Sequence, residues 1–293
     1  MFSFIYKGGS RIVLKHFRIS NYFSAHTLLF FKASLQEKDC LIQLTLNNMS
    51  NTMSPPASPA NTPTQDKEVK QEQRHSRTVV PVNITSDIER ANNTLTKAFV
   101  DSPGNDYLMK KFFDIPIEQK VSKARVNSIL HYFTALYADM GGEIVEANDF
   151  DAVAVFTKPG LHIDQGVTND PKFNKTFFED LTHKKHEVLP EGVDYYYLFI
   201  LGKNLEHPEV RGSVRAIFET YKKKADEAGV AIVLEAISEH AKSVYEYFGF
   251  ENYLSFEYGR GEVDSKGNSD PNGEGFVGHL MIYYKDTLPG ALA

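Results

Sequence analysis

A glycine-containing turn between an apolar strand and a helix is the segment with the clearest chemical meaning. The turn His207–Ser213 reads HPEVRGS and follows the apolar run Tyr195–Gly202. A strand that ends at a helix N-terminus leaves backbone N–H groups unpaired, and the positive end of the helix dipole points the same way. Gly212 lets the backbone approach a ligand closely. The segment predicts an anion site, and the alternative is an ordinary strand-to-helix turn.

Two side chains after this turn have types suited to proton transfer. Glu235 lies near the end of the apolar run Ala231–Ala236, and Tyr245 precedes Phe250 by five residues on the next helix. A carboxylate can accept a proton and a phenol can donate one. The alternatives are a solvated or merely cation-binding carboxylate for Glu235, and an aromatic ring that packs a helix against a sheet for Tyr245.

The elements that must position these residues form a continuous run of strand, turn, helix, strand and helix. The first helix ends at Gly229, and the second closes in YEYFGF at Phe250. This order and this ending resemble the acetyl-CoA-binding half of the GNAT acetyltransferase superfamily. The remaining expected elements are a strand at Thr78–Asn83, a helix over Ile88–Phe99 broken at Pro103-Gly104, a helix over Ile117–Met140, a hairpin joined at Asn148–Asp151, a helix over Phe173–Leu189 and two final strands, ENYLSFEYG and GHLMIYYK.

The resulting order, β-α-α-β-β-β-α-β-α-β-β, matches the GNAT order from Thr78 to Lys285, with Phe173–Leu189 as one addition. The resemblance implies an α/β (α+β) fold. We expect a mixed, mostly antiparallel sheet of about seven strands flanked by helices.

The resemblance also implies which residues hold coenzyme A. The family motif Gln/Arg-x-x-Gly-x-Gly/Ala falls on Glu209–Val214, so backbone amides of Arg211, Gly212, Ser213 and Val214 would bind the pyrophosphate. Glu209 and Val214 depart from the motif. A carboxylate beside a pyrophosphate is repulsive, and a β-branched side chain is expected to crowd it, while Arg211 would offset part of the repulsion.

Backbone groups of the fourth strand and two side chains complete the implied site. Pantetheine would pair with the backbone at Phe199, Ile200 and Leu201, in the gap where the fourth strand splays from the fifth. By the resemblance, Tyr245 protonates the departing thiolate and Glu235 is the candidate base. The acceptor would bind near the Asn148–Asp151 loop, the first two helices and the Phe173–Leu189 segment.

We therefore expect an N-acetyltransferase that moves an acetyl group from acetyl-CoA to the amine of a small molecule, without a metal. Two alternatives stay open, a GNAT-fold pseudoenzyme or binding module with impaired CoA binding, and a protein or peptide N-acetyltransferase. His183 and His186 stand three residues apart with no evident third ligand, so a surface helix face is favoured over a metal site.

Composition limits the partners of this 293-residue chain. The net charge is −6, and no long Lys/Arg stripe or membrane-length apolar run appears, so neither nucleic acid nor membrane is expected as a partner. The single cysteine, Cys40, excludes an intrachain disulfide. A homodimer stays open.

The chain divides by composition into three regions. Residues 1–48 hold six basic and two acidic residues, with no acid before residue 37, which suits either a mitochondrial transit peptide or an unstructured extension. Residues 49–77 are rich in Ser, Pro, Thr, Asn and Gln and predict a disordered linker. Residues 78–293 are expected to form the GNAT domain. The expected location is cytoplasmic, or mitochondrial if residues 1–36 are a transit peptide.

Overall fold

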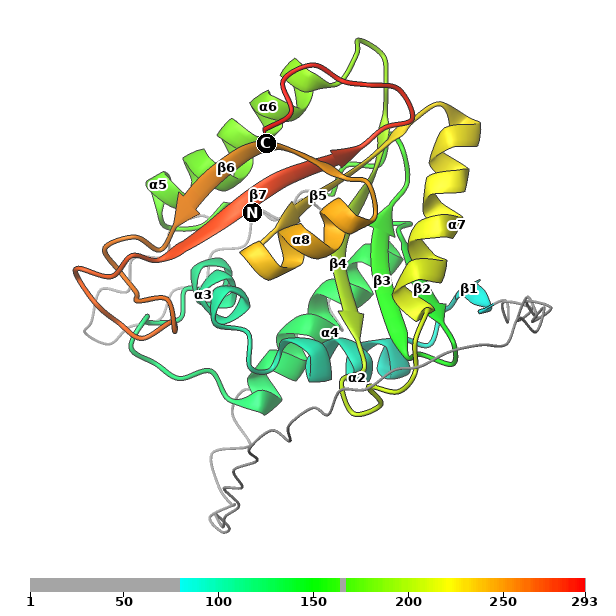
Figure 1. Ribbon diagram of the computed structural model, residues 1–293. Helices are drawn as coiled ribbons and strands as arrows, with labels where there is room; N and C mark the ends of the chain where they lie inside the picture. The colour runs from blue at the N-terminus through cyan, green and yellow to red at the C-terminus, as the bar shows by residue number, and fades with distance from the viewer. Residues whose placement is uncertain (1–79, 164–166, 293) are drawn as a thin grey trace, which may run out of the picture. The chain divides into compact units, whose positions relative to one another are not determined.

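A seven-stranded sheet organises the part of the chain that the structure describes. The computed structural model describes residues 80–163 and 167–292, so the expected extension 1–48 and linker 49–77 lie outside the described residues. The strands lie in the order β1-β2-β3-β4-β5-β7-β6, and only β4 and β5 run parallel (Figure 1). The expected mixed, mostly antiparallel sheet is confirmed.

The elements follow each other as β1 (Val82–Ile84), α2 (Ile88–Phe99), α3 (Pro103–Phe112), α4 (Lys123–Asp139), β2 (Glu143–Ala147), β3 (Ala152–Thr157), α5 (Pro171–Asn174), the π-helix η1 (Lys175–Asp180), α6 (Leu181–Val188), β4 (Tyr195–Lys203), α7 (Ser213–Ala228), β5 (Ala231–Ala236), α8 (Glu239–Tyr247), β6 (Glu251–Tyr258) and β7 (Phe276–Tyr283).

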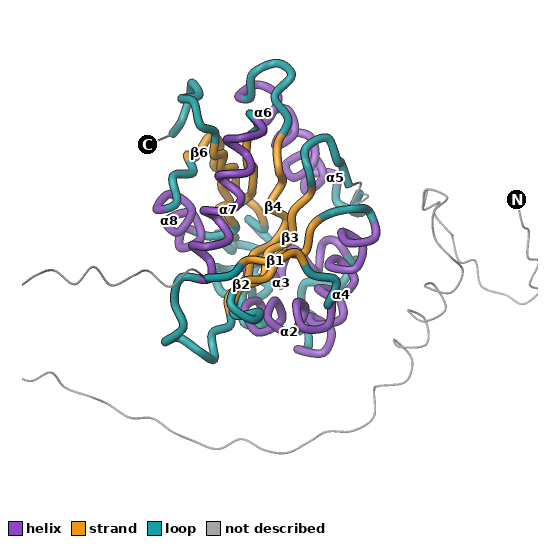
Figure 2. The backbone as a smooth tube through the Cα atoms, turned by 90° about the vertical axis from the view of Figure 1, so that its right-hand side faces the viewer, coloured by secondary structure: helices purple, strands orange, loops and turns teal. Residues whose placement is uncertain are grey.

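Helices cover both faces of the sheet. Helices α7 and α8 pack on one face, where Ile217, Phe218 and Tyr221 of α7 are fully buried. On the other face, α2 and α4 cover β2 to β4, while α5, η1 and α6 cover β5 to β7. Figure 2 shows α7 and α8 on one side of the strands, with α4 and α5 on the other. A ligand that reaches the sheet from α7 and α8 therefore approaches it from the face opposite α6.

Capping side chains fix where the first helices begin. The carboxylate of Asp87 accepts a hydrogen bond from the backbone N–H of Arg90, and the hydroxyl of Ser122 accepts one from the N–H of Arg125. Asp87 is therefore the N-cap of α2. Helix α4 starts at Lys123, six residues later than expected.

The order of elements departs from expectation at Pro103-Gly104. We expected these residues to break a helix, but Pro103 occupies the first turn of α3, so three helices lie between β1 and β2 instead of two. Proline is tolerated there because the N–H that it lacks would have no partner inside the helix.

The added segment Phe173–Leu189 is helical, as expected, but it contains a π-helix turn at Lys175–Asp180. Such turns are rare and occur often at functional sites. None of the helices within residues 80–163 and 167–292 is long and apolar enough to cross a membrane.

Candidate active site

The two parallel strands at the centre of the sheet part after a short pairing. Tyr195–Tyr197 of β4 pair with Ala231–Val233 of β5, and no later pair joins them. Strand β4 nevertheless continues to Lys203 along β3, and β5 continues to Ala236 along β7. The facing edges of β4 and β5 beyond these three pairs thus line a gap in the sheet, as the family resemblance implies.

A β-bulge shapes the β4 edge of this gap. Val155 of β3 pairs with Ile200, whereas the next residue, Phe156, pairs with Leu198, so Phe199 is the extra residue of the bulge. Phe199 and Ile200 accordingly pack on one face of the sheet, while Leu201 packs on the other. A bulge leaves the backbone groups of its extra residue outside the strand ladder. Phe199, Ile200 and Leu201 therefore lie together at the gap, where the sequence predicted the cofactor backbone contacts.

The turn before α7 has the geometry of an anion-binding helix N-terminus. Gly212 adopts the left-handed conformation with φ of 94° at the position preceding the helix, and no side chain caps α7. Ser213 is fully buried, and its hydroxyl donates to the Asp151 carboxylate at 2.6 Å. The Ser213 side chain is thereby occupied, so the first-turn backbone N–H groups are what remains for an anion.

The two residues that depart from the family motif behave differently. Val214 packs its side chain against the core formed with α7 and the sheet, so the expected crowding of the phosphate does not follow from its β-branch. Glu209 is exposed and pairs with His207 at 3.3 Å. A hydrogen bond from its own backbone N–H, with His207 beside it, lowers the pKa of Glu209, so the carboxylate is charged at neutral pH. Arg211 is also exposed.

Tyr245 reaches the α7 face of the sheet from α8. Its ring meets Phe218 edge-on at 5.9 Å and Phe250 at 5.8 Å between ring centroids. Burial raises the pKa of Tyr245 to about 12, so the phenol keeps its proton at neutral pH. Its helical neighbour Tyr247 is exposed and accepts a hydrogen bond from Arg215.

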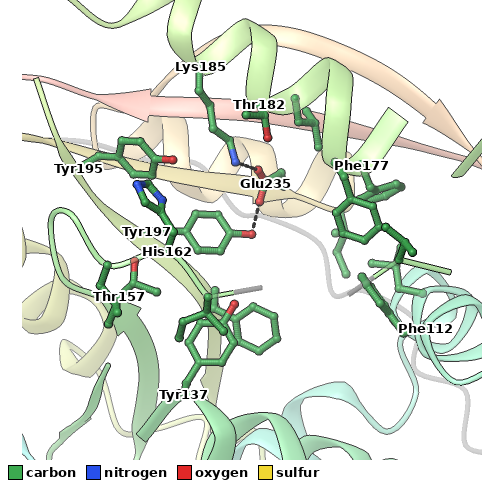
Figure 3. Close-up of a pocket in the computed structure, with 18 residues that line it drawn as sticks. Phe112, Tyr137, Thr157, His162, Phe177, Thr182, Lys185, Tyr195, Tyr197 and Glu235 are labelled. Carbon is green, nitrogen blue, oxygen red and sulfur yellow. Dashed lines mark hydrogen bonds and ion pairs between the residues drawn. The ribbon is translucent and has the colours of Figure 1, made fainter. Parts of the chain in front are cut away.

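Glu235 lines a cavity on the opposite face. The cavity has a volume of about 400 Å³ and lies between α6 and the gap. Figure 3 shows Phe112 and Phe177 across the cavity from Tyr195 and Tyr197. Its aromatic lining consists of Phe112, Tyr137, Phe177, Phe178, Tyr195, Tyr197 and Phe199. The Asn148–Asp151 loop, which we expected near the acceptor, does not line this cavity.

The polar end of the cavity is a three-membered cluster. The Glu235 carboxylate accepts a hydrogen bond from the Tyr197 hydroxyl at 2.5 Å and pairs with the Lys185 ammonium at 2.9 Å (Figure 3). The Lys185 and Glu235 side chains are only 12% and 11% exposed. Burial, with the Glu235 carboxylate beside it, raises the pKa of Tyr197 well above its ordinary value, so Tyr197 remains a donor.

Sequence reasoning found Glu235 but missed both of its partners. Lys185 lies in the segment Phe173–Leu189, which was expected to be helical, and Tyr197 lies in the apolar run Tyr195–Gly202. Tyr197 and Glu235 are 38 residues apart in the sequence, and only the alternation of side chains on β4 and β5 could have suggested their contact.

The described part of the chain contains no group of side chains arranged as a metal site. Among residues 80–163 and 167–292, no three His, Cys, Asp or Glu side chains are grouped so as to hold a metal ion. His183 and His186 lie on α6.

Comparisons with known proteins point to one family. Residues 83–162 match the family model described as the YOR012W acetyl transferase domain. Protein YDR391C of Saccharomyces cerevisiae is 52% identical over 210 residues, which cover 71% of this chain and 88% of that protein. N-acetyltransferase C550.08 of Schizosaccharomyces pombe is 26% identical over 182 residues, 56% of this chain and 70% of that protein. Among solved structures, arylalkylamine N-acetyltransferase 2 of Aedes aegypti aligns with a TM-score of 0.46 and 16% identity, over 71% of this chain and 99% of that one.

Proposed function

The chain belongs to the GNAT family of N-acetyltransferases, and we propose that it transfers the acetyl group of acetyl-CoA to the amine of a small molecule by direct attack. The observation that carries this proposal is the gap between β4 and β5. An uncapped helix N-terminus and Tyr245 lie on one face of the sheet, and a cavity lined by Glu235 lies on the other.

The cofactor side of the gap fits coenzyme A. The left-handed Gly212 precedes the uncapped first turn of α7, whose backbone N–H groups suit a pyrophosphate. The free edge of β4, with its bulge at Phe199, offers backbone groups to an extended chain such as pantetheine. A backbone N–H at this edge would also stabilise the negative charge that develops on the thioester oxygen.

Residues on the two faces would divide the proton transfers. The amine nitrogen attacks the thioester carbonyl, the carbon–sulfur bond breaks, and Tyr245 gives its proton to the leaving sulfur. Glu235 takes the proton that the amine loses, directly or through a water. The 2.5 Å hydrogen bond from Tyr197 holds the Glu235 carboxylate in place.

The size and the lining of the cavity favour a small molecule over a peptide. Rings from α3, α4, η1 and β4 line a cavity of about 400 Å³, a volume within the range typical of small-molecule sites. A peptide acceptor would need hydrogen-bond partners for its backbone, whereas the lining is mostly aromatic and aliphatic.

A panel experiment tests the proposed function. The protein is incubated with acetyl-CoA and single small amines or peptides, thiol release is followed, and the product is identified by mass spectrometry. We expect N-acetylated product from at least one small amine. Product found only on peptides would overturn the choice of acceptor.

A binding module without activity is the second candidate, and the charged Glu209 beside the phosphate turn favours it. Calorimetric titration with CoA separates the candidates. Binding without product identifies a binding module, and absence of CoA binding contradicts both the enzyme and the CoA-binding module.

A further inference from the structure

The cavity beyond Glu235 has an unusual division between its walls and its polar end. Apart from the ring side chains named above, the lining is aliphatic except for Thr157, His162, Thr182, Lys185 and Glu235. Glu235 is the one carboxylate among these lining residues, and it already has a cation, the Lys185 ammonium, at 2.9 Å. The same ammonium lies 4.9 Å from the centre of the Tyr197 ring. The cluster therefore forms a site for a single cation, made of one carboxylate and one ring face.

Lys185 fills this cation site from within the chain. Glu235 lies two residues beyond the last β4–β5 pair, so the site borders the gap where an acceptor amine must arrive. An acceptor ammonium that entered while Lys185 stayed would add a second positive charge beside one carboxylate. Since like charges repel strongly where solvent is excluded, the acceptor must displace Lys185 from Glu235.

The walls specify what the amine is attached to. Rings in the wall already pack against each other, with Phe112 and Phe178 edge-on at 6.0 Å and Tyr137 and Phe199 stacked at 4.2 Å between centroids. An aromatic guest would extend this packing through the same offset and edge-on contacts. A polyamine would press its second ammonium against the apolar wall without a carboxylate partner.

This inference rests on the proposed function. We infer that the acceptor is a primary amine that carries a single positive charge and an aromatic group. Lys185 is then a specificity-determining residue, because its ammonium must leave Glu235 when the acceptor binds. The π-helix turn η1 contributes to this selection because it brings Phe177 and Phe178 into the wall.

Acceptor binding can be measured without catalysis. We propose calorimetric titration of the full chain with 2-phenylethylamine, hexylamine and spermidine. We expect the tightest binding for 2-phenylethylamine. Equal or tighter binding of hexylamine or spermidine would overturn the aromatic selection.

The role of Lys185 is tested by Lys185→Met, with Lys184→Met as the matched control. Lys184 precedes it on α6, pairs with Glu187 at 2.9 Å and does not line the cavity. Removing the competing ammonium should tighten 2-phenylethylamine binding about tenfold, as expected for a largely buried charge contact, and Lys184→Met should leave it unchanged. Unchanged or weaker binding by Lys185→Met would overturn the displacement.

A double variant guards against an indirect effect on folding. In Glu235→Gln the carboxylate is gone, so adding Lys185→Met should no longer tighten binding. Tightening that persists without the carboxylate contradicts competition for Glu235. Thiol release with the same amines tests the proposed function separately from this inference. Binding that follows these expectations without acetylation contradicts the proposed function alone, and acetylation that favours a non-aromatic amine contradicts this inference alone.

Discussion

At the scale of single residues, burial keeps the proposed proton donor Tyr245 in its protonated form. The rings of Phe218 and Phe250 pack edge-on against it, and its pKa of about 12 keeps the phenol protonated well above neutral pH. A group whose pKa is raised holds its proton below that value and loses it only as the pH rises through it. Loss of activity in mildly alkaline solution would therefore have another origin.

We predict that Tyr245→Phe lowers turnover with little change in acetyl-CoA affinity. A positioned proton donor contributes roughly 10²–10⁴-fold to a rate, whereas the ring contacts of Tyr245 remain in phenylalanine. Steady-state kinetics on the amine that proves active, together with CoA titration, measure both quantities. The neighbour variant Tyr247→Phe is the control, because Tyr247 is exposed. Normal turnover of Tyr245→Phe would leave this residue with a packing role only.

Candidate site residues could be predicted only where a short sequence pattern marks them. Gly212 and Tyr245 could be predicted because a turn and a helix ending each carry a short sequence pattern. The pairing of Lys185 with Glu235 could not, since 50 positions separate them and nothing in either neighbourhood specifies the other. The bulge at Phe199 was missed for a different reason, because a uniformly apolar strand shows no change of pattern where one residue is added.

At the scale of elements, α7 depends on a conformation that only glycine adopts easily. Gly212 before the helix and Gly229 after it both have positive φ, 94° and 66°. Their surroundings are also open, since an added Cβ would meet nothing closer than 3.5 Å at Gly212 and nothing within 4 Å at Gly229. The two positions therefore share the same backbone constraint, although only Gly212 belongs to the predicted anion site.

This symmetry gives a matched pair of variants. Gly212→Ala and Gly229→Ala should each lower the free energy of unfolding by about 1–2 kcal/mol, the cost of a left-handed residue with a Cβ. Only Gly212→Ala should weaken CoA binding, because the first-turn amides move with it. Chemical denaturation and calorimetry check the two expectations. Equal CoA affinity in both variants would show that this turn does not hold the cofactor.

The elements themselves were more predictable than their boundaries. Seven strands and the helices after β4 follow from apolar runs and glycine stops, which act locally. The third helix before β2 was missed because Pro103-Gly104 suits both a break and a helix start, and packing of Tyr107 and Met109 into the core decides between them.

At the scale of the whole molecule, the sequence separates residues 1–77 from the domain by composition alone. We predict that a chain beginning at Thr78 melts within about 5 °C of the full chain. Residues 49–77, through which residues 1–48 join the domain, offer few large apolar side chains to pack on it, and a change below about 1 kcal/mol shifts Tm only slightly. Circular dichroism melting of both chains measures this. A larger loss would mean that the N-terminal region contributes to the stability of the domain.

The short pairing between β4 and β5 also has a mechanical consequence. Four strands on one side and three on the other are joined within the sheet by only three residue pairs, Tyr195–Tyr197 with Ala231–Val233. The two half-sheets are thus joined by few strand-to-strand hydrogen bonds, and most of the resistance to their separation must come from the helices that bridge them. A molecule that lies in the gap and forms hydrogen bonds with both edges would restrict the motion of the two half-sheets relative to each other. We expect such a molecule to slow amide hydrogen exchange throughout both half-sheets, and not only at the gap.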